Sequence, residues 1–236
     1  MPFSAHRKLP ALIRELGWID GALYALDQMV MAAIGRRFLI RYYIVAQPIP
    51  ERPPAATKRG ASIEVREFGA AAPELAGLPL TPEVIRSRFA QNSVCFGAFR
   101  DSRIVGCLWL CLGTYLEDEV RCRFEPAPND RAVWDYDVYV HPDHRLGVAF
   151  ARLWEAAGEY LRGRGYGWSV SRISAFNPKS LASHFRLGAI PCGSLTVLCT
   201  SRAQLSLSTF APRLHLQFGT RSIPHYRISV PQRSNA

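Results

Sequence analysis

A short turn in the middle of the chain carries residue types that suit a bound phosphate. The stretch HPDHRLGVAFARL (141–153) follows a strand-like run, VWDYDVYV (133–140), and continues into an amphipathic run. Gly147 lets the backbone approach a ligand, Ala149 keeps the next position open, and Arg145 can contact phosphate oxygens. A helix that begins there offers unpaired N–H groups and a positive dipole end to a pyrophosphate. A strand-to-helix turn that binds nothing is the competing interpretation.

A second motif follows one strand later. NPKSLASHFRLGA (177–189) starts with Asn177 as an N-cap, has proline next and stops at Gly188. Ser180 and His184 are four residues apart, so they share one face of this predicted helix. The geometry suggests two parallel strands, each followed by a helix, with the first turn holding a phosphate and this second helix presenting His184. A histidine that is only hydrogen-bonded in the helix packing is the alternative.

Two carboxylates lie on the strand before the turn. Asp135 and Asp137 are two residues apart, so on a regular strand they share one face, opposite Trp134, Tyr136 and Val138. Carboxylates this close can raise the pKa of one of them toward that of a useful base. Three roles remain open: a general base, a site for a cationic substrate, or ion pairs with nearby arginines.

The elements that must position these residues alternate between strand and helix patterns. The predicted strands are 62–68, 93–101, 103–116, 131–140, 168–176, 193–199 and 213–218, and the predicted helices are 81–91, 148–165 and 177–189. Thr81 as N-cap and Pro82 at the first helical position mark the start of the first of these helices. The order β-α-β-β-β-α-β-α-β-β predicts an α/β domain whose central mixed sheet is flanked by helices.

The N-terminal segment differs from this pattern. Between residues 9 and 47, apolar residues at 12, 16, 19, 23, 26, 30 and 34 form one helical stripe. A membrane span is not expected, because Asp20 and Asp27 would each cost roughly 2.5–3.5 kcal/mol in the bilayer. Basic and aromatic residues after the helix suit a peripheral membrane contact; packing on the main domain or in a homodimer is the alternative. We therefore expect a helical extension (1–47), a proline-rich linker (48–60), the α/β domain (61–220) and a tail (221–236).

The composition is that of a globular protein, with 48% hydrophobic and 20% charged residues. The net charge of +10 suits a phosphorylated ligand, an anionic membrane surface or nucleic acid, but the arginines are spread along the chain. We therefore expect no nucleic-acid partner. The six cysteines form no CxxC pair and have no zinc spacing, and MPFSAHRKLP lacks the order of a signal peptide. Reduced cysteines, a cytoplasmic location and no metal are the expectations.

Together, the two motifs resemble the signatures of the GNAT acyltransferases. The pyrophosphate signature of that family, V-x-P-x-x-R with a glycine-rich loop and a helix, is similar to the run from Val140 to Ala149, with Pro142, Arg145 and Gly147 in place. The later signature matches at Asn177, Ser180, His184 and Gly188. The resemblance covers about residues 61–200, and the motifs occur in the order of the family.

The resemblance implies acyl transfer by direct attack of an amine on acetyl-CoA or another acyl-CoA. A backbone N–H of the strand end would polarise the thioester carbonyl, Asp135 or Asp137 would act as base, and His184 would protonate the leaving thiolate. The residues implied in donor binding are Val138, Tyr139, Val140, His144, Arg145, Leu146, Gly147, Val148, Ala149, Asn177 and Ser180.

The sequence departs from the family pattern at three places. The loop from Arg145 to Gly147 is one residue short, so either His144 takes the first loop position or fewer amides are available. His184 stands where tyrosine is usual. In family members an acid on the strand before the turn often lies on the same face as the Val138 position, which on a regular strand is the face opposite Asp135 and Asp137. For either of them to match that acid, the strand would need a bulge, or the proton would have to pass through water.

The acceptor is the least defined part of the prediction. The segment 114–134 is long and charged for a turn, with Glu117, Asp118, Glu119 and Glu125. Three interpretations remain open: it gates the acceptor site, it orders a cationic amine, or it is a solvated loop. We expect N-acyl transfer to a small-molecule amine or lipid-linked acceptor, in the cytoplasm or at the inner face of the membrane. The alternatives are O-acyl or acyl-carrier-protein-dependent transfer to a lipid or sugar, and a non-catalytic acyl-CoA sensor.

Overall fold

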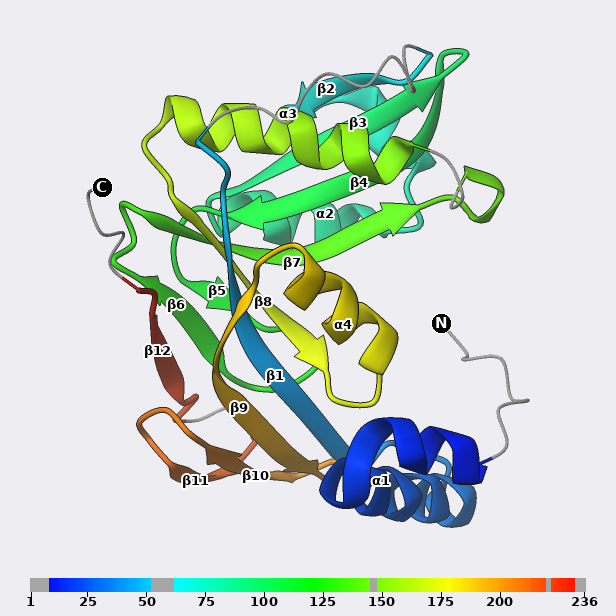
Figure 1. Cartoon of the computed structure of the whole chain (residues 1–236), viewed down its shortest axis with the longest axis vertical. Helices are drawn as coiled ribbons and strands as arrows, with labels where there is room; N and C mark the ends of the chain where they lie inside the picture. Colours follow the sequence, from blue (N-terminus) through cyan, green and yellow to red (C-terminus); the bar gives the residue numbers. More distant parts are fainter. Residues whose placement is uncertain (1–8, 52–61, 145–147, 220–221, 232–236) are drawn as a thin grey trace. The chain divides into compact units, whose positions relative to one another are not determined.

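The computed structural model describes residues 9–51, 62–144, 148–219 and 222–231 (Figure 1). Its elements are α1 (Leu9–Ile34), β1 (Leu39–Pro48), β2 (Glu64–Phe68), η1 (Pro73–Gly77), α2 (Pro82–Ala90), β3 (Ser93–Arg100), β4 (Arg103–Cys111), β5 (Tyr115–Leu116), β6 (Arg123–Ala127), β7 (Ala132–Val140), η2 (Pro142–His144), α3 (Ala149–Gly163), β8 (Trp168–Ser174), α4 (Pro178–Arg186), β9 (Ile190–Cys199), β10 (Ala203–Ser208), β11 (Leu214–Phe218) and β12 (His225–Ser229).

The described residues form two compact units. The first unit comes from the ranges 1–45, 117–123 and 172–226, and the second from 46–116, 124–171 and 227–236. Strands β1 and β8 each contribute one part to each unit.

The second unit contains the strands that lead to the predicted phosphate turn. Its strands follow the order β8-β7-β4-β3-β2, with β7 parallel to β8 and the other neighbours antiparallel. Leu153 of α3 packs with Leu108 and Leu110 of β4, whereas Ile85 of α2 packs with Trp109. Because alternate residues of a strand point to opposite sides, α3 and α2 cover opposite faces of this sheet (Figure 1).

The first unit is built around β1, β9, β10 and β11. β10 pairs antiparallel with both β9 and β11, and the N–H of Cys199 in β9 donates to the carbonyl of Phe38 at 2.7 Å, beside the start of β1. Leu16 and Leu23 of α1 pack in one cluster with Leu39 of β1. Helix α4 packs through Leu181 on a second small cluster in this unit.

Local signals in the sequence predicted most of the helices correctly. The helices expected at 81–91, 148–165 and 177–189 are α2, α3 and α4. Thr81 Oγ1 accepts from the N–H of Val84 at 3.4 Å, and Asn177 Oδ1 accepts from the N–H of Ser180 at 3.2 Å, so both predicted N-caps are confirmed.

Several strands were not predicted from the sequence. Residues 39–47, expected to continue the helical extension, form most of β1 instead, because their Tyr-, Ile- and Val-rich run pairs with neighbouring strands. The segment 114–134 contains β5 and β6 rather than a plain loop, and β10 lies in a region with no predicted element. The division into extension, linker, domain and tail stays a prediction, and residues 52–60 of the linker lie outside the described residues.

Helix α1 is turned differently from the expectation based on its apolar stripe. Asp20 and Asp27, which fall off the stripe, are buried, whereas Ile19, Leu26 and Ile34 of the stripe are exposed. Gly17 has a positive φ of 78° and kinks the helix. In the part of the chain that the structure describes, no helix is long and apolar enough to cross a bilayer.

Candidate active site

A β-bulge interrupts β7 at the centre of the predicted site. Across the antiparallel pair with β4, Asp137 lies opposite Trp109 and Asp135 lies opposite Leu110. Two neighbouring residues of β4 therefore face a three-residue stretch of β7, and Tyr136 is the extra residue. On its other side, β7 pairs in parallel with β8 from Ala132 to Asp135.

The bulge places the two candidate bases on opposite faces of β7. Asp135 lies opposite Leu110 and Val138 opposite Leu108, on the face covered by α3, whereas Asp137 shares the α2 face with Trp109. The expectation that Asp135 and Asp137 share a face is therefore wrong, because an extra residue breaks the period of two. The bulge that the resemblance required is present, and it brings Asp135 to the face of Val138.

The two carboxylates also have different partners. Asp135 is 6% exposed, and its Oδ2 accepts a long hydrogen bond of 3.4 Å from the hydroxyl of Ser169 on β8. Asp137 is one third exposed, and its Oδ2 accepts from Nη1 of Arg88 at 2.6 Å. The ion-pair alternative therefore describes Asp137 well, and Asp135 is the more deeply buried of the two carboxyl groups.

Arg88 is a residue that the sequence analysis missed. It is buried on α2, and its guanidinium lies 5.1 Å from the ring centres of both Trp109 and Tyr136. Burial alone would lower the pKa of Arg88, but the Asp137 carboxylate raises it overall. Its spacing of three residues from the buried Ile85 was the available signal, since it places Arg88 on the inward face of α2.

The predicted donor-binding residues divide between the two units. Val138, Tyr139 and Val140 lie on β7 beyond the bulge, His144 ends η2, and Val148 and Ala149 begin α3, all in the second unit. Arg145, Leu146 and Gly147 lie outside the described residues. Asn177 and Ser180, with the candidate acid His184, belong to α4 of the first unit.

The start of α3 matches the chemistry expected of the turn. Val148 is its N-cap and makes no side-chain cap, and the first-turn N–H groups of any α-helix have no intrahelical partner. The N–H of His141 donates to the carbonyl of Val105 at 2.8 Å, which fixes the end of β7 just before the turn. These backbone groups suit an anionic ligand.

Burial changes the protonation of His184. Loss of hydration lowers the pKa of this half-buried imidazole below its ordinary value. At neutral pH its neutral form is therefore favoured over the imidazolium, so a role as general acid requires that it first take up a proton.

The acidic segment expected to lie near the acceptor is partly buried. Nε of Arg172 on β8 donates to Glu117 at 2.5 Å, and the Arg172 guanidinium lies 4.8 Å from the ring centre of Tyr42. Asp118 and Glu119 are half exposed, with oxygens 3.6 and 3.8 Å from Arg172. Burial raises the pKa of Glu117 to about 7, because its loss of hydration outweighs the charge of Arg172. Glu117 is thus part of a packed cluster and not of a solvated loop.

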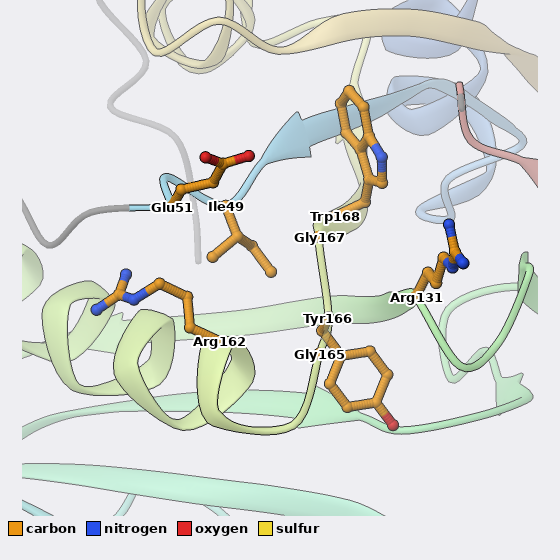
Figure 2. A pocket seen from close by; sticks show the side chains of 8 residues that line it. All are labelled: Ile49, Glu51, Arg131, Arg162, Gly165, Tyr166, Gly167 and Trp168. Atoms are coloured by element: carbon orange, nitrogen blue, oxygen red, sulfur yellow. The ribbon is translucent and has the colours of Figure 1, made fainter. Parts of the chain in front are cut away.

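A cavity in the second unit lies away from the predicted donor turn. It has a volume of about 440 Å³ and is lined by Ile49, Glu51, Arg131, Arg162, Gly165, Tyr166, Gly167 and Trp168 (Figure 2). Trp168 starts β8 and Arg131 immediately precedes β7, so the cavity is at the opposite end of β7 from Val140. None of the predicted site residues lines it. Within the described ranges, no group of three or more His, Cys, Asp or Glu side chains is arranged to hold a metal.

Comparisons with known proteins give similarity at the level of structure. Neither the search of protein-family models nor the search of curated proteins found a match. Among solved structures, a tandem GNAT protein of the clavulanic acid pathway aligns with 70% of this chain and 55% of its own length, at 20% identity and a TM-score of 0.45. This chain thus spans only about half of that protein.

Two further solved structures are similar over about half of this chain. An aminoglycoside N-acetyltransferase in complex with CoA aligns with 56% of this chain and 91% of its own, at 17% identity and a TM-score of 0.42. An acetyltransferase of Trypanosoma brucei aligns with 53% and 91%, at 19% identity and a TM-score of 0.39. The described elements form a large mixed sheet flanked by helices, as the sequence pattern predicted.

Proposed function

We propose that the protein is an acyltransferase that moves an acyl group, most simply acetyl, from an acyl-CoA to a primary amine. The bulge at Tyr136 carries this proposal. It lies in β7 just before Val138–Val140, and a backbone N–H of this strand end is our candidate donor to the substrate. A thioester carbonyl is a suitable acceptor for such an N–H, and the adjacent start of α3 suits the pyrophosphate.

The reaction needs one bond exchange and two proton transfers, one from the ammonium to a base and one from an acid to the thiolate. The amine lone pair attacks the thioester carbonyl carbon, the new C–N bond forms, the C–S bond breaks and the CoA thiolate leaves. Asp135 on the Val138 face is our candidate acceptor of the ammonium proton, directly or through water. Asp137 is assigned a positioning role, because its carboxylate is engaged by Arg88. His184 is our candidate acid: it takes up a proton from solvent and then delivers it to the leaving thiolate.

The first test is donor binding. CoA should raise the melting temperature of the wild-type protein, and Arg145→Ala should weaken CoA binding about tenfold or more, the cost of losing a charge-assisted hydrogen bond. Arg103→Ala is the matched control, since Arg103 is an exposed arginine of the β3–β4 hairpin in the same unit. Equal CoA affinity in all three proteins would contradict the assignment of the turn.

The second test is turnover. Thiol release from acetyl-CoA is measured with a panel of primary amines, and the pH profile is repeated for Asp135→Asn, Asp137→Asn and His184→Phe. Loss of the ionisation that limits the profile in Asp135→Asn alone would support its role as base, while a rise in KM alone would not. Unchanged turnover in His184→Phe would remove His184 from the mechanism. CoA binding without thiol release for any amine would favour the sensor alternative.

A further inference from the structure

Helix α1 has an exposed apolar stripe, although Asp20 and Asp27 of the same helix are buried. Trp18, Ala22, Leu26, Met29 and Ala33 follow the helical spacing of four, four, three and four residues, and all are exposed. Trp18 is 89% exposed and Met29 63%. Single exposed apolar side chains are ordinary, but a continuous stripe of them marks an interaction surface.

Asp20 and Asp27 of α1 point inward and have partners there. Asp20 accepts hydrogen bonds of 2.6 Å from both Nε of Arg41 and the hydroxyl of Tyr43. Asp27 accepts from the backbone N–H groups of Phe38 and Leu39 at 3.2 and 3.0 Å. These four bonds fix the rotation of the helix, so the apolar stripe cannot turn inward without unpairing two buried carboxylates.

The β10–β11 hairpin also exposes apolar side chains and buries polar ones. Leu207, Leu214, Leu216 and Phe218 are 47 to 66% exposed, although they belong to a folded sheet. The alternate positions Gln204, Ser206 and Gln217 are at most 1% exposed. Here the polar face of two strands is buried and the apolar face is in water, the reverse of the usual arrangement of an antiparallel sheet.

Register places the two apolar surfaces on one side of the first unit. Leu198 of β9 packs in the cluster that contains Leu16 and Leu23 of α1. Leu198 lies opposite Leu205, and Leu205 lies opposite Leu216. Directly opposite residues share a face, so this row leads from the sheet beneath α1 to the exposed leucines of the hairpin.

The charges on these elements are almost all positive. Arg14, Arg36 and Arg37 of the α1 region are exposed, as are Arg202 and Arg213 beside the hairpin. Glu15 is the exposed acid of segment 14–37, and segment 200–219 contains no acid. Beyond Glu159 the sequence has ten lysines and arginines and no aspartate or glutamate. An apolar surface with cationic edges complements a bilayer with anionic headgroups, whereas nucleic acid would not cover its leucines.

We propose that the exposed face of α1 and the apolar face of β10–β11 together form a docking surface for an anionic lipid bilayer. Trp18, Met29, Leu216 and Phe218 enter the headgroup and acyl boundary, and the surrounding arginines contact lipid phosphates. This proposal is independent of the proposed acyl transfer, because none of the predicted donor or catalytic residues belongs to the surface.

The test is binding of the full chain to vesicles. It should sediment with phosphatidylcholine vesicles that contain about 30% phosphatidylglycerol, and about 0.5 M salt should release much of it. Leu216→Gln and Met29→Gln should each weaken binding about tenfold, as expected for one apolar side chain withdrawn from the interface. Leu116→Gln is the matched control, since Leu116 is 40% exposed on β5 in the second unit. Trp18 should report insertion by a blue shift in emission that Trp18→Phe abolishes.

Three results would overturn the proposal. The first is failure of the wild-type protein to sediment with the anionic vesicles. The second is equal binding of the wild-type, Leu216→Gln and Met29→Gln proteins. The third is a stable dimer in light scattering that Leu216→Gln converts to monomer, which would make this face a contact between two copies of the chain.

Discussion

The ion pair between Arg88 and Asp137 gives the sharpest prediction of energetic coupling at the site. Arg88 is 7% exposed and Nη1 lies 2.6 Å from Asp137 Oδ2, so Asp137→Asn leaves a buried guanidinium without this carboxylate. Breaking a buried pair costs about 3–5 kcal/mol. Because the Asp137 side chain is 33% exposed and partly screened, we expect about 2–3 kcal/mol.

The reverse change should cost less. Arg88→Met keeps an unbranched apolar stem over Trp109 and Tyr136 and leaves Asp137 able to gain water, so we expect about 1–2 kcal/mol, including the lost cation–π contacts. The double variant should then be more stable than the sum of the single effects predicts, by about 1–2 kcal/mol.

Urea denaturation of the four proteins in this cycle measures the coupling. Glu64→Gln is the control, because the pair of Glu64 with Arg66 has side chains 62% and 48% exposed and is screened by water, so this change should leave stability almost unaltered. Additive effects within about 0.5 kcal/mol would refute the coupling. If the pair positions the bulge, Arg88→Met should also reduce kcat in the thiol-release assay while the pH profile keeps its shape.

Three further predictions follow from single residues. The pKa of Glu117 is raised from 4.5 to about 7, so between these pH values the folded state holds a proton that the unfolded state has lost. The free energy of unfolding should therefore fall as pH rises from about 5 to above 7. Glu117→Gln should remove up to roughly 3 kcal/mol of this pH dependence, measured by denaturation at a series of pH values. Gly106→Ala would place a Cβ 2.7 Å from the carbonyl oxygen of Tyr139, so it should destabilise the protein by about 1–3 kcal/mol and weaken CoA binding in calorimetry. Asn177→Ala should lower stability by about 1 kcal/mol through loss of the α4 cap, and Asn177→Ser should restore most of it.

Local chemistry made much of the fold predictable. N-caps such as Thr81 and Asn177 act on N–H groups two or three residues away, so their signal is complete within a short stretch of sequence. The β3–β4 hairpin was also predictable from two β-rich runs and the short turn between them. The order of these elements was enough to predict a mixed sheet flanked by helices.

Strand β1 shows where such local patterns fail. Its run of Tyr, Ile and Val follows directly on a helical pattern, and only the neighbouring strands of the sheet decide that it is extended. Its partners in the sheet are distant in sequence, so no local signal marks them.

The sequence by itself determined the residue types of the site: an arginine and a glycine before a helix, two carboxylates on one strand, and a histidine about two turns beyond a capped helix start. The tertiary structure decided how they are oriented. A bulge set by pairing with β4 separates Asp135 from Asp137, and contacts with Arg41, Tyr43 and two backbone N–H groups turn the acids of α1 inward. The periods of 2 and 3.6 residues specify which side chains share a face, but only the partners in space specify which face is buried and where the period is broken.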